Sequence, residues 1–262
     1  MGSHTKPTTS LCRHGNDAIF YRHNNLVEEL MGRRSFTEVM FEHILGRAPR
    51  ASESTMLDAV LVATMEHGLT PSAVAARLIY MSSPENIQAG VSAGLLGVGS
   101  QFIGSTEDCA RLLESIGDAA DPAETARALA VSYREQRRAV PGFGHHLHRP
   151  DDPRAVKLLQ LSQDFGLAGH GVARLKLLAE AVDQSAGRHV TINATGATAA
   201  VLYDMRVPIA AMRGFAVISR AAGLVAHLLE EQQRPSGRFI WDLVDKSIPF
   251  EAATPSTESA KA

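Results

Sequence analysis

The sequence predicts a predominantly α-helical protein, with at most short strands near the N-terminus. Apolar residues recur at helical spacing along most of the chain. Helix-start signals, in which a capping side chain precedes proline, occur at Asp121-Pro122 and Asp152-Pro153. Strand-like patterns are confined to 17–22 and His189–Ile192. With 262 residues, 45% of them hydrophobic, the chain can bury a core in one or two domains.

The first part of the chain holds the expected strand and four expected helices. Residues 1–12 are polar and rich in threonine, and we expect them to be loose. A short strand is expected at 17–22, followed by a turn at Asn24-Asn25. Ser52 and Thr70-Pro71 are interpreted as helix starts. The expected helices cover 35–45, 52–64, 70–81 and 86–98.

The second part of the chain is expected to be helical almost throughout. Breaks are expected at Gly166, at Gly187-Arg188 and at Pro208. The tail from Ala252 is rich in Ser, Thr and Pro and is expected to be disordered. The expected helices cover 122–138, 153–165, 170–186, 194–204 and 214–232.

The charge balance and cysteine content exclude several classes of protein. The net charge is −2 and the charges are interspersed, so neither nucleic acid nor a membrane surface is an expected partner. Cys12 and Cys109 lie in no metal-binding or redox motif, which indicates free thiols in a reducing compartment. We find no apolar run of transmembrane length and no signal-peptide pattern at the start. The expected location is the cytoplasm.

The richest segment of the sequence is the connection from Val140 to Arg154. Pro141 must end the preceding helix, while Gly142 and Gly144 allow left-handed backbone and close approach of a ligand. Asp152 is expected to cap the next helix, with Pro153 at its first position. Arg154 then lies in the first helical turn, beside unpaired backbone N–H groups. This corner is a candidate anion site.

Three histidines of the same connection, His145, His146 and His148, raise the question of a metal. They lie on a loop and not on one helix face, and no HExxH motif or cysteine partner accompanies them. We therefore expect no metal site. The Gly-x-Gly pattern is no dinucleotide fingerprint either, because it lacks the third glycine and the surrounding βαβ unit.

Arginines outside and inside this connection indicate a polycarboxylate ligand. Arg220 interrupts a stretch, 214–229, that is apolar on nearly every face, where a charge needs a partner or a bound anion. An internal ion pair is the alternative explanation. Together with Arg154 and with Arg234 before Pro235, it could clamp carboxylates. His67 ends one helix just before the next, where an imidazole can face a cleft or serve only structurally.

Four blocks of the sequence resemble the citrate synthase family, and specifically its short citryl-CoA lyase-like branch. They follow one another in family order and span about residues 15 to 250, and the second block is highly specific. They are Glu66-His67-Gly68-Leu69-Thr70-Pro71-Ser72, Pro141-Gly142-Phe143-Gly144-His145 with Asp152-Pro153-Arg154-Ala155, Asn193-Ala194-Thr195-Gly196, and Ser219-Arg220-Ala221-Ala222-Gly223 through His227 to Arg234-Pro235.

The resemblance implies an all-α, citrate synthase-like two-domain fold. It implies an obligate homodimer, or a higher homo-oligomer, with the active site in the cleft between the domains. The large domain would combine 15–108 with 213–250, and the small domain would cover 109–212. The segments 1–14 and 251–262 would be flexible tails.

The resemblance also assigns roles to residues. His67 and His145 match histidines that hold the α-keto acid or its tertiary alcohol. Arg154 and Arg220 match arginines that bind substrate carboxylates, and Arg234 matches one that is donated to the partner's site. The backbone of the segment Val140, Gly142, Phe143 and Gly144 matches the loop that cradles coenzyme A. No bound cofactor is implied, because the CoA thioester is a substrate.

The implied reaction is retro-Claisen cleavage of citryl-CoA to acetyl-CoA and oxaloacetate. It needs a base or hydrogen-bond acceptor at the tertiary hydroxyl, for which we choose His145, and cations on the carboxylates. Phe102 replaces a histidine of the synthases, as in the lyase module of ATP-citrate lyase, which favours a lyase. Thr195 falls where the family has its catalytic aspartate, and its hydroxyl cannot act as a carboxylate base.

Two alternatives to the lyase stay open because of Thr195. One is an enzyme of the same fold with other chemistry, such as a citrate or methylcitrate synthase-type condensing enzyme. The other is a non-catalytic homologue that binds CoA or a polycarboxylate.

Overall fold

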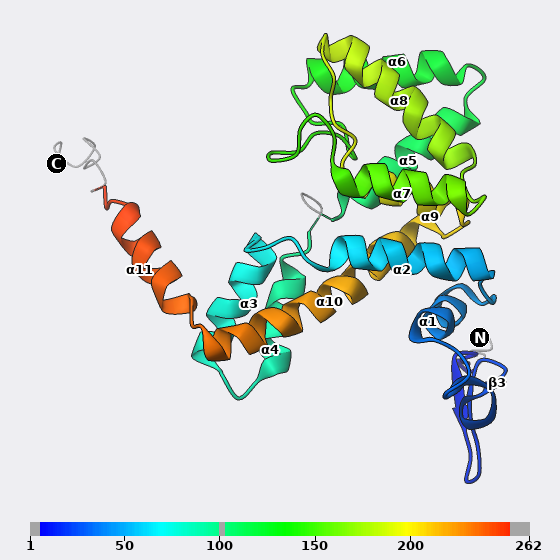
Figure 1. Cartoon of the computed structure of the whole chain (residues 1–262), viewed down its shortest axis with the longest axis vertical. Helices are drawn as coiled ribbons and strands as arrows, with labels where there is room; N and C mark the ends of the chain where they lie inside the picture. The colour runs from blue at the N-terminus through cyan, green and yellow to red at the C-terminus, as the bar shows by residue number, and fades with distance from the viewer. Residues whose placement is uncertain (1–5, 100–102, 252–262) are drawn as a thin grey trace, which may run out of the picture. The chain divides into compact units, whose positions relative to one another are not determined.

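The computed structural model describes residues 6–99 and 103–251 and is mostly helical, which confirms the predicted class (Figure 1). Contacts divide the chain into two compact units. Among the described residues, unit 1 combines the chain up to Glu66 with Val98–Arg220, and unit 2 combines His67–Gly97 with the chain from Ala221 onward. These bounds differ from 15–108, 109–212 and 213–250, and the predicted domain division stays a prediction.

Unit 1 begins with a small antiparallel sheet in the order β1-β2-β3. The strands are Cys12–His14, Ile19–Tyr21 and Asn24–Asn25, and Phe20 lies opposite Asn25. The strand expected at 17–22 is therefore confirmed in its centre. The turn expected at Asn24-Asn25 is wrong, because both residues pair with β2. The Asn25 side chain then caps a short π-helical segment, Leu26–Leu30, by accepting from two backbone N–H groups.

Two helices follow, α1 (Phe36–Leu45) and α2 (Ala51–Met65). Ser35 and Glu38 form a reciprocal capping box at the start of α1. Ser52 does not cap α2, contrary to expectation. The helix starts one residue earlier, where the Glu53 carboxylate accepts from the backbone N–H of Arg50 at 2.8 Å.

Five further helices contribute to the core of unit 1. The predicted caps are confirmed, since Asp121 accepts from Glu124 N and Asp152 accepts from Arg154 N. Helix α5, which the sequence analysis did not predict, packs on α9 and buries Cys109, Leu113 and Ile116. The helices are α5 (Ser105–Asp118), α6 (Pro122–Glu135), α7 (Pro153–Asp164), α8 (His170–Ala186) and α9 (Ala194–Asp204).

Unit 2 contains α3 (Pro71–Ser82), α4 (Ile87–Leu96) and α11 (Gly237–Ser247). Helix α11 was not predicted. Pro71 stands at the first position of α3, as expected. Helices α3 and α4 pack on the C-terminal part of α10 (Ile209–Gln233), whose Leu224 and Leu228 lie against Gly94 and Gly90 of α4.

Helix α10 begins directly after Pro208, five residues earlier than the predicted 214. By length and composition it could cross a membrane, with 25 residues and an 18-residue window of mean hydropathy 1.5, so the prediction that no run has transmembrane length is wrong. The core helix of a soluble protein has the same properties. Met212 and Phe215 of α10 are fully buried in the core of unit 1, and Leu224 and Leu228 in that of unit 2, as expected of a core helix.

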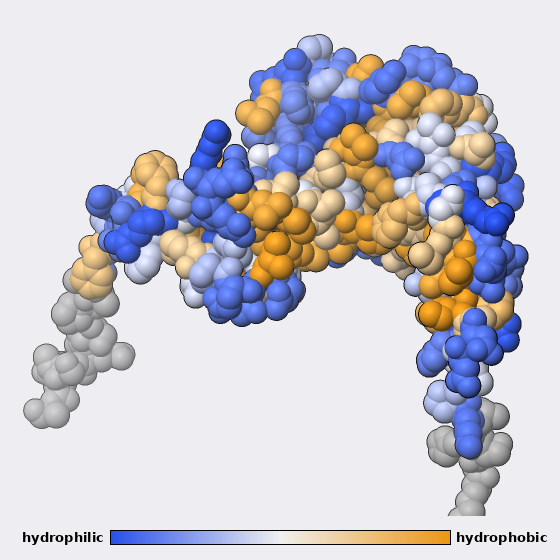
Figure 2. Space-filling view, turned by 60° about the horizontal axis from the view of Figure 1, so that its bottom comes forward, coloured by the Kyte–Doolittle hydropathy of each residue, from blue (hydrophilic) through white to orange (hydrophobic). Residues whose placement is uncertain are grey.

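Several large apolar side chains of unit 2 face solvent, and apolar surface is visible in Figure 2. Leu96 at the end of α4 is 88% exposed, and Trp241 of α11 is 54% exposed. Exposed apolar area of this kind is a common mark of a protein–protein interface. Other members of the group are Leu69, Phe239, Ile248 and Phe250.

Candidate functional site

The connection between α6 and α7 is held against the start of α9 by backbone hydrogen bonds. Gly144 N donates to Thr191 O at 2.7 Å, and Asn193 N donates to Gly142 O at 3.0 Å. Both glycines have positive φ, +89° and +79°, as predicted for this bend. The strand expected at His189–Ile192 reduces to the single bridge between Phe143 and Ile192 that these bonds create.

The segment expected to cradle coenzyme A is largely enclosed. Val140 and Phe143 pack in the core of unit 1, and Gly142 is buried beneath the Cys109 side chain of α5. Burial raises the pKa of the Cys109 thiol to about 12, so this cysteine is an apolar packing residue. Gly144 is half-buried, so backbone contact with a ligand can occur at this end of the segment.

Asp152 fixes the orientation of Arg154. The Asp152 carboxylate is fully buried and accepts from Arg154 Nε at 3.1 Å and Nη2 at 2.8 Å. It also accepts from Ala194 N at 3.1 Å, which ties the start of α7 to the start of α9. Burial opposes its charge, but the hydrogen bonds and charge of Arg154 outweigh that penalty and lower the pKa of Asp152. A half-buried guanidinium is thus held in one geometry.

His145 has a defined tautomer. Its Nδ1 accepts from the backbone N–H groups of Leu147, at 3.1 Å, and His148, at 3.0 Å. Burial, followed by the charge of His148, lowers the pKa of His145, so the ring is neutral at pH 7. A neutral imidazole that accepts at Nδ1 carries its proton on Nε2. His145 therefore carries a hydrogen-bond donor at Nε2, whereas the resemblance predicts a base or hydrogen-bond acceptor at this residue.

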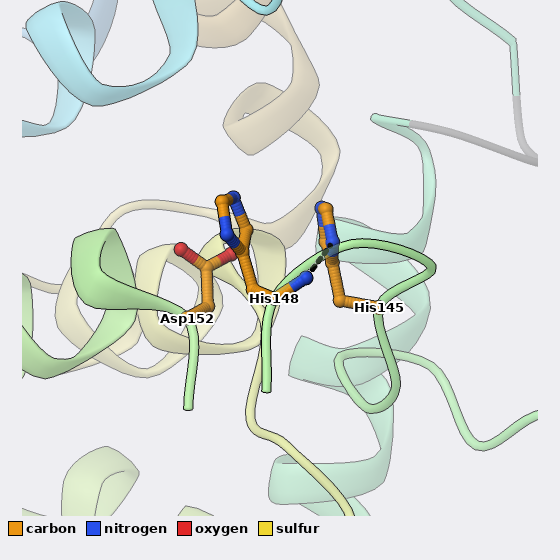
Figure 3. Close-up of side chains that lie close together, drawn as sticks. All are labelled: His145, His148 and Asp152. Carbon is orange, nitrogen blue, oxygen red and sulfur yellow. Dashed lines mark hydrogen bonds between the residues drawn. The ribbon is translucent and has the colours of Figure 1, made fainter. Parts of the chain in front are cut away.

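The side chains of His145, His148 and Asp152 lie close together, as Figure 3 shows. One potential ligand atom from each falls within 4.8 Å of the others. Both Asp152 oxygens, however, already accept from Arg154, whose positive charge would repel a cation. The geometry favours an anion over a metal ion here, and the expectation of no metal stays a prediction.

Thr195 lies in the first turn of α9 and takes part in a chain of polar contacts. Its Oγ1 is 2.7 Å from Asn193 Oδ1 and 2.8 Å from Ser105 Oγ, at the start of α5. No local sequence pattern marks Ser105 as a site residue, because the partner hydroxyl is 90 residues away along the chain. Both hydroxyl-bearing residues are half-buried.

Arg220 is buried, with 6% of its surface exposed, as its apolar surroundings predicted. Among the described residues, its Nε and Nη1 atoms find no hydrogen-bond partner. Burial lowers its pKa first, Glu66 counteracts this, and the like charge of Arg154 lowers it further. The like charge of Arg154 is thus part of the electrostatic surroundings of Arg220. A buried cation with unsatisfied donors beside a second cation is a site for an anion.

The remaining predicted site residues belong to unit 2 or lie outside the description. His67 follows α2 and is half-buried, and Arg234 is exposed in the turn between α10 and α11. Phe102 lies outside the described residues.

A buried ion-pair network in unit 2 holds the turn that carries Arg234. Arg77 of α3 donates to Glu231 at 2.8 Å and to His227 Nδ1 at 3.1 Å. Glu231 in turn accepts from the backbone N–H groups of Ser236 and Gly237, each at 2.7 Å, at the start of α11. No local sequence pattern predicts this network, because Arg77 and His227 are 150 residues apart along the chain.

Residues 12–241 match the family model described as citrate synthase, C-terminal domain. A solved structure of citryl-CoA lyase from Hydrogenobacter thermophilus is 28% identical, has a TM-score of 0.83, and covers 95% of this chain and 96% of its own. Putative citrate synthase 2 of Mycobacterium tuberculosis is 29% identical over 200 residues, 73% of this chain and 52% of that protein. The 2-methylcitrate synthase of Shewanella oneidensis is 27% identical over 80% of this chain and 57% of its own. The chain thus spans about half the length of these curated relatives.

Proposed function

The chain belongs to the citrate synthase family, and from this membership we propose that it is a citryl-CoA lyase-like enzyme. It would cleave citryl-CoA, or a related 3-hydroxy polycarboxyl-CoA, to acetyl-CoA and oxaloacetate. The likeness to citryl-CoA lyase over nearly the whole of both chains supports this choice. The CoA thioester would be a substrate and not a resident cofactor.

The pair Arg154 and Arg220 is the observation that carries the proposal. One guanidinium is oriented by a buried carboxylate, and the other is buried with two nitrogen atoms unpartnered. A ligand with two or more carboxylates would satisfy these donors and remove the repulsion between the cations. Citryl-CoA carries two free carboxylates besides its thioester.

His145 would act in the cleavage as a hydrogen-bond donor. Its Nε2–H would stabilise the oxygen of the tertiary alcohol as that oxygen becomes the carbonyl of oxaloacetate. The electron pair of the broken C–C bond enters the acetyl group as an enolate. The alcohol loses one proton and the methyl carbon gains one, so the reaction balances without a co-reactant. Because Nδ1 already accepts from two backbone N–H groups, His145 would not act as the base.

The contacts of Thr195 favour cleavage over condensation. A condensing enzyme must take a proton from the acetyl methyl group, a weaker acid than the tertiary alcohol that loses its proton in cleavage, so condensation requires the stronger base. Thr195 stands in the position of the family's carboxylate, but its hydroxyl contacts Asn193 Oδ1, which can only accept. A condensing enzyme for citrate or methylcitrate stays the alternative function that the relatives' names support.

The test is a direct assay with citryl-CoA in which released oxaloacetate is measured through malate dehydrogenase. We expect turnover by the parent and a loss of about 10²-fold or more in kcat for His145→Ala. Arg220→Met should lower kcat/KM by at least about 30-fold, since the site loses a buried charge partner. His170→Ala and Arg111→Ala, which change exposed helix residues, are matched controls.

Two outcomes would overturn the lyase. Absence of turnover by the parent, together with citrate formation from acetyl-CoA and oxaloacetate, would establish the condensing alternative. Absence of both, with citrate or CoA binding in calorimetry, would establish a non-catalytic binding protein. The variant Thr195→Asp, which restores the family's carboxylate, would then show whether the site can still catalyse the citrate synthase reaction.

We further propose that the protein is a homodimer in the cytoplasm. The exposed apolar side chains of unit 2, among them Leu96 and Trp241, support the dimer. Cys12 and Cys109 are both unpaired, which fits a reducing compartment. Light scattering of the purified protein should give twice the chain mass of 28.1 kDa. Leu96→Glu should shift the mass toward the monomer, whereas Val156→Glu, an exposed change on α7, should not.

A further inference from the structure

Ser105 and Thr195 form a pair of hydroxyl groups on two different helices of unit 1. Ser105 is the first residue of α5 and Thr195 is the second residue of α9, and their oxygen atoms are 2.8 Å apart. Distance alone allows either hydroxyl to be the donor. The neighbouring contacts decide which one donates.

Asn193 fixes the direction of the hydrogen bonds. Its Nδ2 donates to Gly144 O at 3.0 Å, and a carbonyl can only accept, so the amide orientation is settled. Asn193 Oδ1 therefore faces α9, where it accepts from Thr195 N and Gly196 N, each at 3.1 Å. It is also 2.7 Å from Thr195 Oγ1. Since Oδ1 has no hydrogen, the Thr195 hydroxyl must donate its proton to Asn193.

The Ser105 hydroxyl is consequently the donor within the pair. Because the Thr195 hydroxyl donates its single proton to Asn193 Oδ1, it can only accept a hydrogen bond from Ser105. The bonds run from Ser105 to Thr195 and on to Asn193, which is itself tied to Gly144, next to His145. Thr195 is β-branched and anchored, whereas a serine hydroxyl turns easily to a new acceptor. Of the two hydroxyl groups, that of Ser105 can therefore donate a hydrogen bond to a bound ligand.

We propose that Ser105 is a catalytic residue that donates a hydrogen bond to the thioester oxygen of the acyl-CoA substrate. This inference rests on the proposed lyase function. In that function the guanidinium groups take the free carboxylates and His145 takes the tertiary alcohol. The remaining arm of the substrate is the thioester, an uncharged group that fits an uncharged donor. Ser105 and Thr195 provide such a donor, in a segment bonded directly to the loop of His145.

The hydrogen bond from Ser105 would strengthen during the reaction. When the C–C bond breaks, its electron pair moves into the acyl group and the thioester oxygen becomes an enolate oxygen. A donor aimed at that oxygen stabilises the developing charge. Ser105 keeps its proton throughout, and the methyl carbon is protonated by the equivalent of the proton that the tertiary alcohol lost. Thr195 holds the Ser105 hydroxyl in the resting state.

The test compares Ser105→Ala with Ser105→Thr, which keeps the hydroxyl. Ser115→Ala, on the same helix with its Oγ bonded to Leu112 O at 2.8 Å, is the matched control. We expect Ser105→Ala to lower kcat for citryl-CoA by about 10²-fold with a smaller change in KM. Ser105→Thr should retain most of the activity, and Ser115→Ala should equal the parent. Circular dichroism of each variant verifies folding.

A binding measurement keeps the test independent of turnover. By calorimetry, Ser105→Ala should bind acetyl-CoA several-fold more weakly than the parent does and bind free CoA equally well. Failure of the parent to cleave citryl-CoA would overturn the lyase, and the acetyl-CoA comparison would still decide the role of Ser105. Turnover within twofold of the parent, or equal acetyl-CoA affinity in parent and variant, would overturn the role of Ser105, as would a parent that binds no acetyl-CoA.

Discussion

Gly142 and Gly196 meet backbone to backbone, so that a Cβ on Gly142 would lie 2.9 Å from Gly196 Cα. This contact seats the bend that precedes His145 directly on the first turn of α9. A side chain on either residue would separate the two segments. The contact explains why a glycine is required inside the first turn of a helix, where glycine is otherwise unfavourable.

Gly196→Ala should therefore destabilise unit 1. The added methyl group must displace the Gly142 backbone, and overpacking of this kind costs about 1–3 kcal/mol of the free energy of unfolding. Denaturant unfolding measures the loss. Gly214→Ala is the control, because in the described part of the chain no atom outside the neighbouring backbone of α10 lies within 4 Å of its Cβ position. Alanine there should raise stability by about 0.5–1 kcal/mol. A Gly196→Ala variant as stable as the parent would contradict the packing argument.

His189 predicts a pH-dependent contribution to stability. Its Nδ1 is 2.8 Å from Asp183 of α8, and its Nε2 is 3.1 Å from Asp151, next to the cap of α7. Hydrogen bonds with Asp183 and then Asp151 raise the pKa of His189. Arg188, whose side chain donates to the His189 carbonyl, is the cation nearby in the sequence. The imidazolium thus joins the C-terminal end of α8 to the loop of the candidate site.

The direction of this pH dependence follows from the raised pKa of His189. The stabilisation is fully present below the unfolded-state pKa of about 6.5 and is lost as the pH rises through the higher folded-state pKa. His189→Gln should therefore lower the melting temperature at about pH 6 and have no effect well above the folded-state pKa. Thermal unfolding across this range measures the difference, with His170→Gln as an exposed control. An equal loss at every pH would exclude titration of His189 as the cause.

Local signals in the sequence predicted much of the fold. Asp121 and Asp152 cap helices because both contacts lie within three residues, so the pattern alone contains them. The burial of Arg220 was likewise visible in its apolar neighbours. Helix α5 went unpredicted, although Cys109, Leu113 and Ile116 are at helical spacing, since its N-cap is Gly104 and no capping side chain marks its start.

The candidate site depended on contacts that no local pattern contains. Family resemblance pointed to Thr195, but only the fold brings Ser105 to it. The orientation of His145 depends on two backbone N–H groups of its own loop, and a sequence does not specify their direction. Sequence reasoning therefore predicted helix caps and the burial of Arg220 better than it predicted which side chains donate and accept protons.

Arg77 should be essential for the stability of unit 2. Its guanidinium is 3% exposed and pairs with Glu231, which is equally buried. Arg77→Met would leave the Glu231 carboxylate without its cation, which costs about 3–5 kcal/mol of unfolding free energy. Glu230 also contacts Arg77 but is 53% exposed, so Glu230→Gln should cost less than about 1 kcal/mol. If denaturant unfolding gave the same loss of unfolding free energy for both substitutions, burial would not be what determines the contribution of each ion pair.

Arg234 provides the sharpest test of a site shared between two chains. If each active site takes His145 from one chain and Arg234 from its partner, then His145→Ala and Arg234→Met should each be inactive alone. In a mixed dimer of the two variants, one site contains both intact residues. Because half of randomly assembled dimers are mixed, unfolding and refolding an equimolar mixture should restore about a quarter of the parent activity. If His145 and Arg234 serve the same site from one chain, every mixed dimer lacks a complete site, and the mixture stays inactive. Mixing His145→Ala with His145→Gln, which cannot complement each other under either arrangement, is the control.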